Sequence, residues 1–146
     1  MGRTPKYVPY NWEHNKKKGK AQFFSVYKSM MDSPAWKELT NRQKVLYLYM
    51  KTQVKPKDSR GEFFFNQALY INVLGLYTNT TSFCTDKDAL IEKGFIDCID
   101  GGSVTKTKAV YRMSDRWIKY GTDQFQCPTS VMSDSLKKKK ARKKAW

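Results

Sequence analysis

Hydroxyl and amide side chains, with one lysine, are gathered between Gly75 and Gly94. The residues concerned are Thr78, Asn79, Thr81, Ser82, Thr85 and Lys87. If this stretch is a helix with Phe83 and Leu90 facing a core, a rotation of about 100° per residue places most of these groups on the opposite face. Threonine and serine hydroxyls hydrogen-bond base edges or phosphates, and a threonine methyl group contacts thymine. We therefore expect a recognition helix for duplex DNA that begins near Thr78, with Thr78 as its N-cap.

The charges of this helix are mixed. Lys87 falls near the core-facing side, from which its stem extends over Phe83 either to a phosphate or simply into solvent. Asp86, Asp88 and Glu92 place negative charge on or near the helix, which contains no arginine. We therefore expect this helix to supply selectivity and other parts of the chain to supply affinity.

Positive charge is abundant elsewhere in the chain. The sequence holds 28 Lys and Arg against 13 Asp and Glu, a formal net charge of +15, which indicates a polyanionic partner. Phosphate contacts are predicted at the tip and returning strand of a hairpin, from Ser103, Thr105, Lys106, Thr107, Lys108 and Arg112. Backbone contacts are predicted at the two chain ends, from Lys16, Lys17, Lys18, Lys20, Lys137, Lys138, Lys139, Lys140, Arg142, Lys143 and Lys144. A polar hairpin tip and solvated tails are the alternatives.

Local signals predict the elements that position these groups. Ser33-Pro34 begins one helix, and the capping box Thr40-Asn41-Arg42-Gln43 begins a second that runs to about Val54. The expected elements after these are a strand at 62–65, a helix from Asn66 to Gly75, the recognition helix ending at Gly94, strands at 95–99 and 109–113, and a short helix before Gly121.

This order of elements predicts an α+β fold, the winged helix-turn-helix, with three to four helices plus a β-hairpin wing. The domain is expected over residues 21–121. A flexible basic arm is expected at 1–20, and a flexible tail at 122–146 that ends in the Lys/Arg-rich run.

Catalytic and metal chemistry have little support. His14 is the only histidine, so no Ser-His-Asp, Cys-His or paired-histidine arrangement can form. The spacing of Cys84, Cys98 and Cys127 does not close a zinc site, which favours free thiols in a reducing cytoplasm. Because a phosphate-binding glycine loop and an apolar membrane span are also lacking, we expect a cytoplasmic, non-enzymatic protein without metal or cofactor and without a membrane partner.

Several segments resemble the amino-terminal domain of plasmid replication initiators from Gram-positive bacteria. They are Phe23-Phe24-Ser25-Val26, the stretches 31–40 and 44–47, the turn at 74–81 and the junction Glu92-Lys93-Gly94-Phe95-Ile96. The resemblance covers about residues 23–113 and implies binding to repeated double-stranded sites, often as a dimer, at an origin on a mobile element. The chain ends soon after this region, where those initiators carry a further domain. In size it is similar to the small accessory proteins of conjugative elements that help assemble a relaxase complex.

The function expected from the sequence is sequence-specific binding of double-stranded DNA. We expect an accessory role at a transfer or replication origin of a plasmid or conjugative transposon, with a relaxase or replication protein as partner and a homodimer on repeated sites. The alternatives are a transcriptional repressor of the same fold, a protein-interaction module with non-specific nucleic-acid-binding tails and, least favoured, a tyrosine-dependent DNA-processing enzyme.

Overall fold

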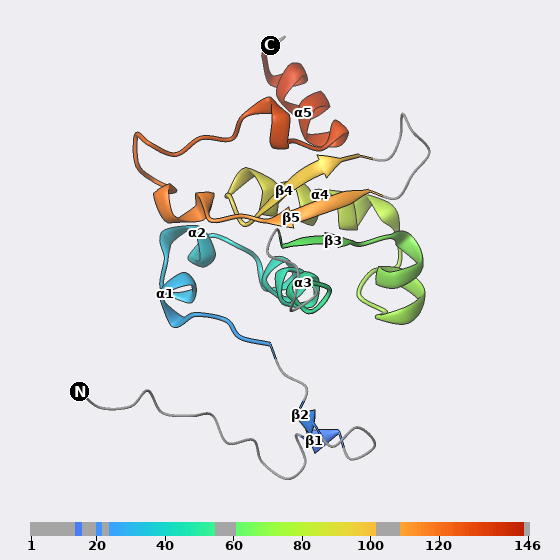
Figure 1. Cartoon of the computed structure of the whole chain (residues 1–146). Helices are drawn as coiled ribbons and strands as arrows, with labels where there is room; N and C mark the ends of the chain where they lie inside the picture. The colour runs from blue at the N-terminus through green and yellow to red at the C-terminus, as the bar shows by residue number, and fades with distance from the viewer. Residues whose placement is uncertain (1–13, 16–19, 22–23, 55–60, 102–108, 145–146) are drawn as a thin grey trace, which may run out of the picture.

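The first part of the domain is helical. A computed structural model describes residues 14–15, 20–21, 24–54, 61–101 and 109–144 (Figure 1). Its helices α1 (Lys28–Met31) and α2 (Pro34–Lys37) are short, and α3 (Asn41–Thr52) is longer. The Ser33 hydroxyl accepts a hydrogen bond from the Trp36 amide (3.3 Å) to begin α2. The predicted helix starts at Ser33-Pro34 and at the capping box are confirmed, because the reciprocal Thr40 and Gln43 bonds both form.

Three strands form an antiparallel sheet with the order β3-β5-β4. These strands are β3 (Glu62–Phe64), β4 (Ile96–Asp100) and β5 (Val110–Met113). The chain therefore crosses from the edge strand β3 to the other edge strand β4 and returns through the centre. Asp97 lies opposite Arg112 and Cys98 lies opposite Tyr111. The predicted strand and hairpin are confirmed within one or two residues at their ends, and the fold is α+β as expected.

Two helices lie between β3 and β4. The helix expected after Asn66 is a π-helix, η2 (Ala68–Val73), in which the Leu74 amide donates to the Leu69 carbonyl at 2.8 Å. The chain then reverses at Gly75, whose φ of +62° favours glycine. The next helix, α4 (Thr80–Glu92), begins two residues later than predicted. Its cap is Asn79, not Thr78, because the Asn79 side-chain oxygen accepts the Ser82 amide at 2.8 Å.

Aromatic side chains fill much of the core. The rings of Trp36, Tyr47 and Phe95 meet edge to edge or edge to face, with centroids 5.5–5.8 Å apart. Tyr70 of η2 stacks on Phe83 of α4 at 3.8 Å between centroids. These contacts hold α4 against the remainder of the domain, with Phe83 and Leu90 buried as predicted.

The chain after the sheet is more ordered than expected. It contains two 3-10 helices, η3 (Arg116–Lys119) and η4 (Thr129–Val131), and then α5 (Asp134–Lys144). Leu136 of α5 is only 2% exposed and belongs to the core. In Figure 1, α5 lies on the β4 side of the domain, with α1, α2 and α3 on the other side. The prediction of a flexible tail over 122–146 is therefore wrong for α5, which is stabilised by docking despite its repelling lysines.

The amino-terminal arm also contains a strand pair that the sequence did not predict. β1 (His14–Asn15) pairs with β2 (Lys20–Ala21) in antiparallel register. None of the helices in the described ranges is long and apolar enough to cross a membrane.

Candidate nucleic-acid interface

The amino-terminal end of α4 is a polar surface. Thr80, Thr81 and Thr85 are exposed and Ser82 is half-buried. The Thr85 hydroxyl donates to the Thr81 carbonyl at 3.1 Å, which orients it along the helix. The predicted recognition residues brought together here are Thr78, Asn79, Thr81, Ser82 and Thr85. All are small, so a flat or grooved partner can approach the helix backbone closely.

Lys87 does not belong to this surface. Only 7% of the residue is exposed, and its ammonium group lies 3.3 Å from the Ser135 hydroxyl and 3.6 Å from the Asp88 carboxylate. It also lies 5.8 Å from the centroid of the Phe83 ring. The ammonium group therefore lies between Phe83, Asp88 and Ser135 of α5, where it is shielded from solvent. The assignment of Lys87 as a phosphate contact, and the alternative of a solvated lysine, are therefore both wrong.

Asp86 points into the domain and joins α4 to α3. Its carboxylate accepts hydrogen bonds from Arg42 Nε at 2.5 Å, Tyr77 Oη at 2.7 Å and Gln43 Nε2 at 3.4 Å, and the residue is 1% exposed. Burial, followed by the hydrogen bond to Asp86, raises the pKa of the Tyr77 hydroxyl, so the hydroxyl stays protonated and donates. The hydrogen bond to Asp86 likewise raises the pKa of Arg42. This carboxylate therefore fixes the position of α4 and adds no exposed negative charge to it.

Asp88 is also buried, although its position on the helix predicted an exposed side chain. Its carboxylate accepts from the Ser133 hydroxyl at 2.5 Å and the Ser135 hydroxyl at 2.8 Å, and it pairs with Lys139 Nζ at 3.2 Å. The residue is 2% exposed. Because α5 covers it, the carboxylate that we expected beside the recognition residues does not face a partner.

The start of α5 has a signal in the sequence that is easily missed. Ser133 accepts the Leu136 amide at 3.3 Å, as an N-cap does, and Leu136 follows as the single buried residue of α5. A serine three residues before an isolated leucine predicts a helix start. The lysines after it hide the pattern because they leave no repeating apolar face.

The exposed basic residues of α5 are Lys137, Lys138, Lys139, Arg142, Lys143 and Lys144, and Lys140 is half-buried. Lys139 pairs with Asp88, and Lys140 lies 4.0 Å from Glu92. Of the predicted contacts in the arm, Lys16, Lys17 and Lys18 lie outside the described residues, and Lys20 is in β2.

The predicted wing is only partly described. Ser103, Thr105, Lys106, Thr107 and Lys108 lie outside the described residues. Arg112 is described, and one of its terminal nitrogens donates to Asp97 at 3.1 Å with 42% of the side chain exposed. Asp97 also accepts from Arg116 Nε at 2.9 Å. Arg112, which the sequence predicted as a phosphate contact, therefore forms an ion pair with Asp97 on the sheet.

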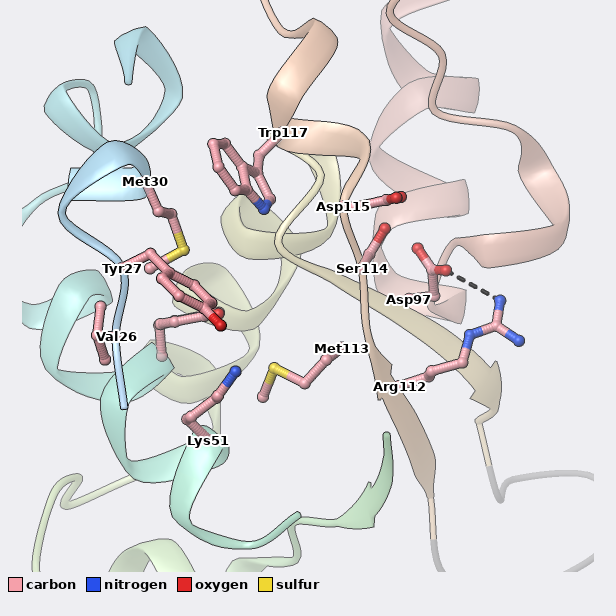
Figure 2. A pocket seen from close by; sticks show the side chains of 11 residues that line it. Val26, Tyr27, Met30, Lys51, Asp97, Arg112, Met113, Ser114, Asp115 and Trp117 are labelled. Atoms are coloured by element: carbon pink, nitrogen blue, oxygen red, sulfur yellow. Dashed lines mark hydrogen bonds and ion pairs between the residues drawn. The ribbon is translucent and has the colours of Figure 1, made fainter. Parts of the chain in front are cut away.

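Arg112 borders a cleft of about 480 Å³ that the sequence did not predict. Figure 2 shows Lys51 entering it from α3, opposite Met113, with Trp117 and Met30 at its apolar end. The charged groups of its wall include the Asp97–Arg112 pair, which Figure 2 marks with a dashed line. Asp97 and Arg112 pair with each other, and no residue of α4 lines the cleft.

Within the described ranges, no group of three or more His, Cys, Asp or Glu side chains is placed to hold a metal ion. Comparisons with protein-family models, curated proteins and solved structures find no match for this chain. The function therefore has to be inferred from the geometry and charge of the surface formed by α4, α5 and the hairpin.

Proposed function

We propose that the chain binds double-stranded DNA through a winged helix-turn-helix in which α4 is the recognition helix. The arrangement of elements supports this proposal. η2, the turn at Gly75 and α4 form a helix-turn-helix unit, and α4 leads directly into the β4–β5 hairpin. The sheet order β3-β5-β4 brings the strand that precedes η2 beside the last strand of the hairpin, as a winged helix requires.

The observation that carries the proposal is the absence of exposed carboxylates from the first two turns of α4, all of which the structure describes. Asp86 is the acidic residue of these turns, and it is buried against Arg42 and Tyr77. The surface that remains consists of hydroxyl groups at the positive end of the helix dipole, which favours approach to phosphates and base edges.

Positive charge elsewhere supplies affinity. The formal net charge of +15 favours a polyanionic partner. Each phosphate neutralised by Lys or Arg releases counterions, so affinity for DNA is expected to fall steeply with salt.

We propose that the cellular role is accessory binding at a transfer or replication origin of a mobile element, together with a relaxase or replication protein. The resemblance of residues 23–113 to plasmid initiators supports this role. A repressor of the same fold is the second candidate. Mapping of bound DNA in the native host separates them, because occupancy at the origin favours the accessory role and occupancy confined to the chain's own promoter favours repression.

The test of DNA reading is a footprint on the native element at several salt concentrations. A sharp footprint over direct or inverted repeats supports specific reading, whereas uniform coverage that vanishes with salt contradicts it. The variant Thr81→Ala/Ser82→Ala is expected to lose about 5- to 150-fold in affinity for the footprinted site, from about 1–3 kcal/mol for a base contact, and little for a scrambled duplex. The matched control is Thr129→Ala/Ser130→Ala, an exposed Thr-Ser pair on η4 that should change neither.

A further inference from the structure

Four residues of α4 form one stripe along the helix. Thr81, Thr85, Asp88 and Glu92 are separated by four, three and four residues, which places them on one face. The two threonines are exposed. Asp88 and Glu92 continue the stripe, but α5 reaches both of them. At the carboxyl-terminal half of this face, α5 therefore buries Asp88 and approaches Glu92, which stays exposed.

The docking of α5 combines an apolar anchor with a buried polar cluster. Leu136 enters the core at 2% exposure. Asp88 receives the hydroxyls of Ser133 and Ser135, and Lys139 pairs with it. A carboxylate with this many donors is stable in the interior only while the donors remain in place, so Asp88 depends on α5 as much as α5 depends on Asp88.

The outward side of α5 is basic. At about 100° per residue, Lys137, Lys138 and Arg142 lie about 100°, 160° and 120° around the helix from the buried Leu136, and all three are exposed. Without α5, the stripe would continue from Thr85 into Asp88, with Lys87 as its remaining ion-pair partner, and Glu92. With α5 docked, Asp88 is buried and paired with Lys139, and Lys140 lies 4.0 Å from the exposed Glu92, so cations of α5 lie beside the carboxyl-terminal half of the stripe.

We propose that α5 is a fixed part of the DNA interface, which covers Asp88, places Lys140 near the exposed Glu92 and holds Lys137, Lys138 and Arg142 for backbone phosphates beside the recognition helix. This inference rests on the proposed function. It differs from the action of a tethered cationic tail, because a docked helix sets where along the duplex its charges bind and so contributes to register as well as to affinity.

Three variants of the full chain test this inference. The charge variant is Lys137→Gln/Lys138→Gln/Arg142→Gln, which preserves the docking contacts. The undocking variant is Ser135→Ala/Leu136→Ala, which removes docking contacts without changing net charge. The control is Lys28→Gln/Lys37→Gln/Lys119→Gln, three exposed lysines on α1, α2 and η3. Each is titrated against the footprinted duplex and a scrambled duplex between 50 and 200 mM salt.

The charge variant is expected to reduce the slope of log K against log salt by about 2.7, at about 0.9 for each phosphate contact. The undocking variant is expected to lose at least about tenfold in affinity for the footprinted site and to lower the ratio of specific to scrambled binding, although its charge is unchanged. The control variant should retain the wild-type slope of log K against log salt and the wild-type ratio of specific to scrambled binding. Its affinity for both duplexes should fall slightly and equally.

Undocking is verified by faster amide exchange in α5, with the melting of the domain measured in parallel. If the undocking variant does not fold, Ser133→Ala/Ser135→Ala replaces it. The inference is overturned if an undocked α5 leaves slope and specificity at wild-type values, or if the charge variant behaves like the control. Absence of any footprint for the wild type would refute the proposed function itself, whereas a footprint that depends on Thr81 and Ser82 but not on α5 would refute this inference alone.

Discussion

Replacement of Asp86 by alanine tests whether a buried carboxylate positions α4. Asp86 is 1% exposed and connects α4 to Arg42 on α3 and to Tyr77 in the turn before α4. The change removes the shared acceptor and leaves its donors behind. It alters no residue of the exposed stripe, so an effect on the domain must pass through the packing of α4.

The magnitude follows from the exposure of the partners. The Tyr77 hydroxyl belongs to a residue that is 6% exposed, and a stranded buried donor costs about 1–3 kcal/mol. Arg42 has 56% of its side chain exposed and is resolvated by water at little cost. The Gln43 bond is long at 3.4 Å and contributes little. With the loss of the short charged hydrogen bond included, we expect Asp86→Ala to lower the free energy of unfolding by about 3 kcal/mol.

The assay is urea unfolding followed by far-ultraviolet circular dichroism, performed as a double-mutant cycle with Tyr77→Phe. The single change Tyr77→Phe is expected to cost about 1–1.5 kcal/mol. In the double variant no buried hydroxyl is left without an acceptor. Its loss in free energy of unfolding should therefore be at least about 1 kcal/mol smaller than the sum of the losses of the two single variants. Arg42→Ala serves as the control for the exposed partner and should lower the free energy of unfolding far less than Asp86→Ala.

Two results would refute this reasoning. A loss below about 1 kcal/mol for Asp86→Ala would mean that Tyr77 finds water or another acceptor when the carboxylate is removed. Strict additivity of the two substitutions would mean that the hydroxyl and the carboxylate do not stabilise each other. Either result would leave the aromatic stacking of α4 as the main determinant of its position.

Three further changes have expected outcomes. Gly94→Ala should cost about 3 kcal/mol in thermal unfolding because its Cβ would lie 2.5 Å from a backbone nitrogen of η3, whereas Gly121→Ala, with similar φ but open space, should cost about 1 kcal/mol. Asn79→Ala should cost about 1 kcal/mol through loss of the cap, and Asn79→Asp should retain stability. Burial raises the pKa of Tyr47 to about 12, above an unfolded value near 10, so the contribution of Tyr47 to stability should be retained below pH 10 and fall by up to about 1.4 kcal/mol per pH unit up to pH 12. Tyr47→Phe should flatten that decline and the exposed Tyr49→Phe should not; equal behaviour of the two would contradict the assignment.

The starts and ends of helices could be predicted because each depends on only a few neighbouring residues. The capping box at Thr40, the proline start at Pro34 and the glycine stop at Gly94 each involve a hydrogen bond or a backbone angle fixed by near neighbours. The single error of this kind, the cap at Thr78, arose because two adjacent residues can both cap a helix. Asn79 is the cap since its oxygen reaches the Ser82 amide.

The surface of α4 could not be predicted in the same way. Helical periodicity separates the side that faces one core from the other side, but it assumes that the other side meets water. Here a segment some 45 residues further along the chain returns, and Ser133 bonds to Asp88 across that separation. Lys87 and Asp88 are buried by that return, and Asp86 is buried by Arg42, 44 residues earlier.

The sequence alone therefore determined the elements from α2 to η3, their order and the small polar residues that α4 exposes at its start. The tertiary structure decided which charges reach the surface, because a charge is hidden or exposed according to the partner that packs over it, and that partner is distant in sequence. Its effect is to bury Asp86 and Asp88 with their partners and to make the lysine-rich tail a helix that docks on the carboxyl-terminal half of α4.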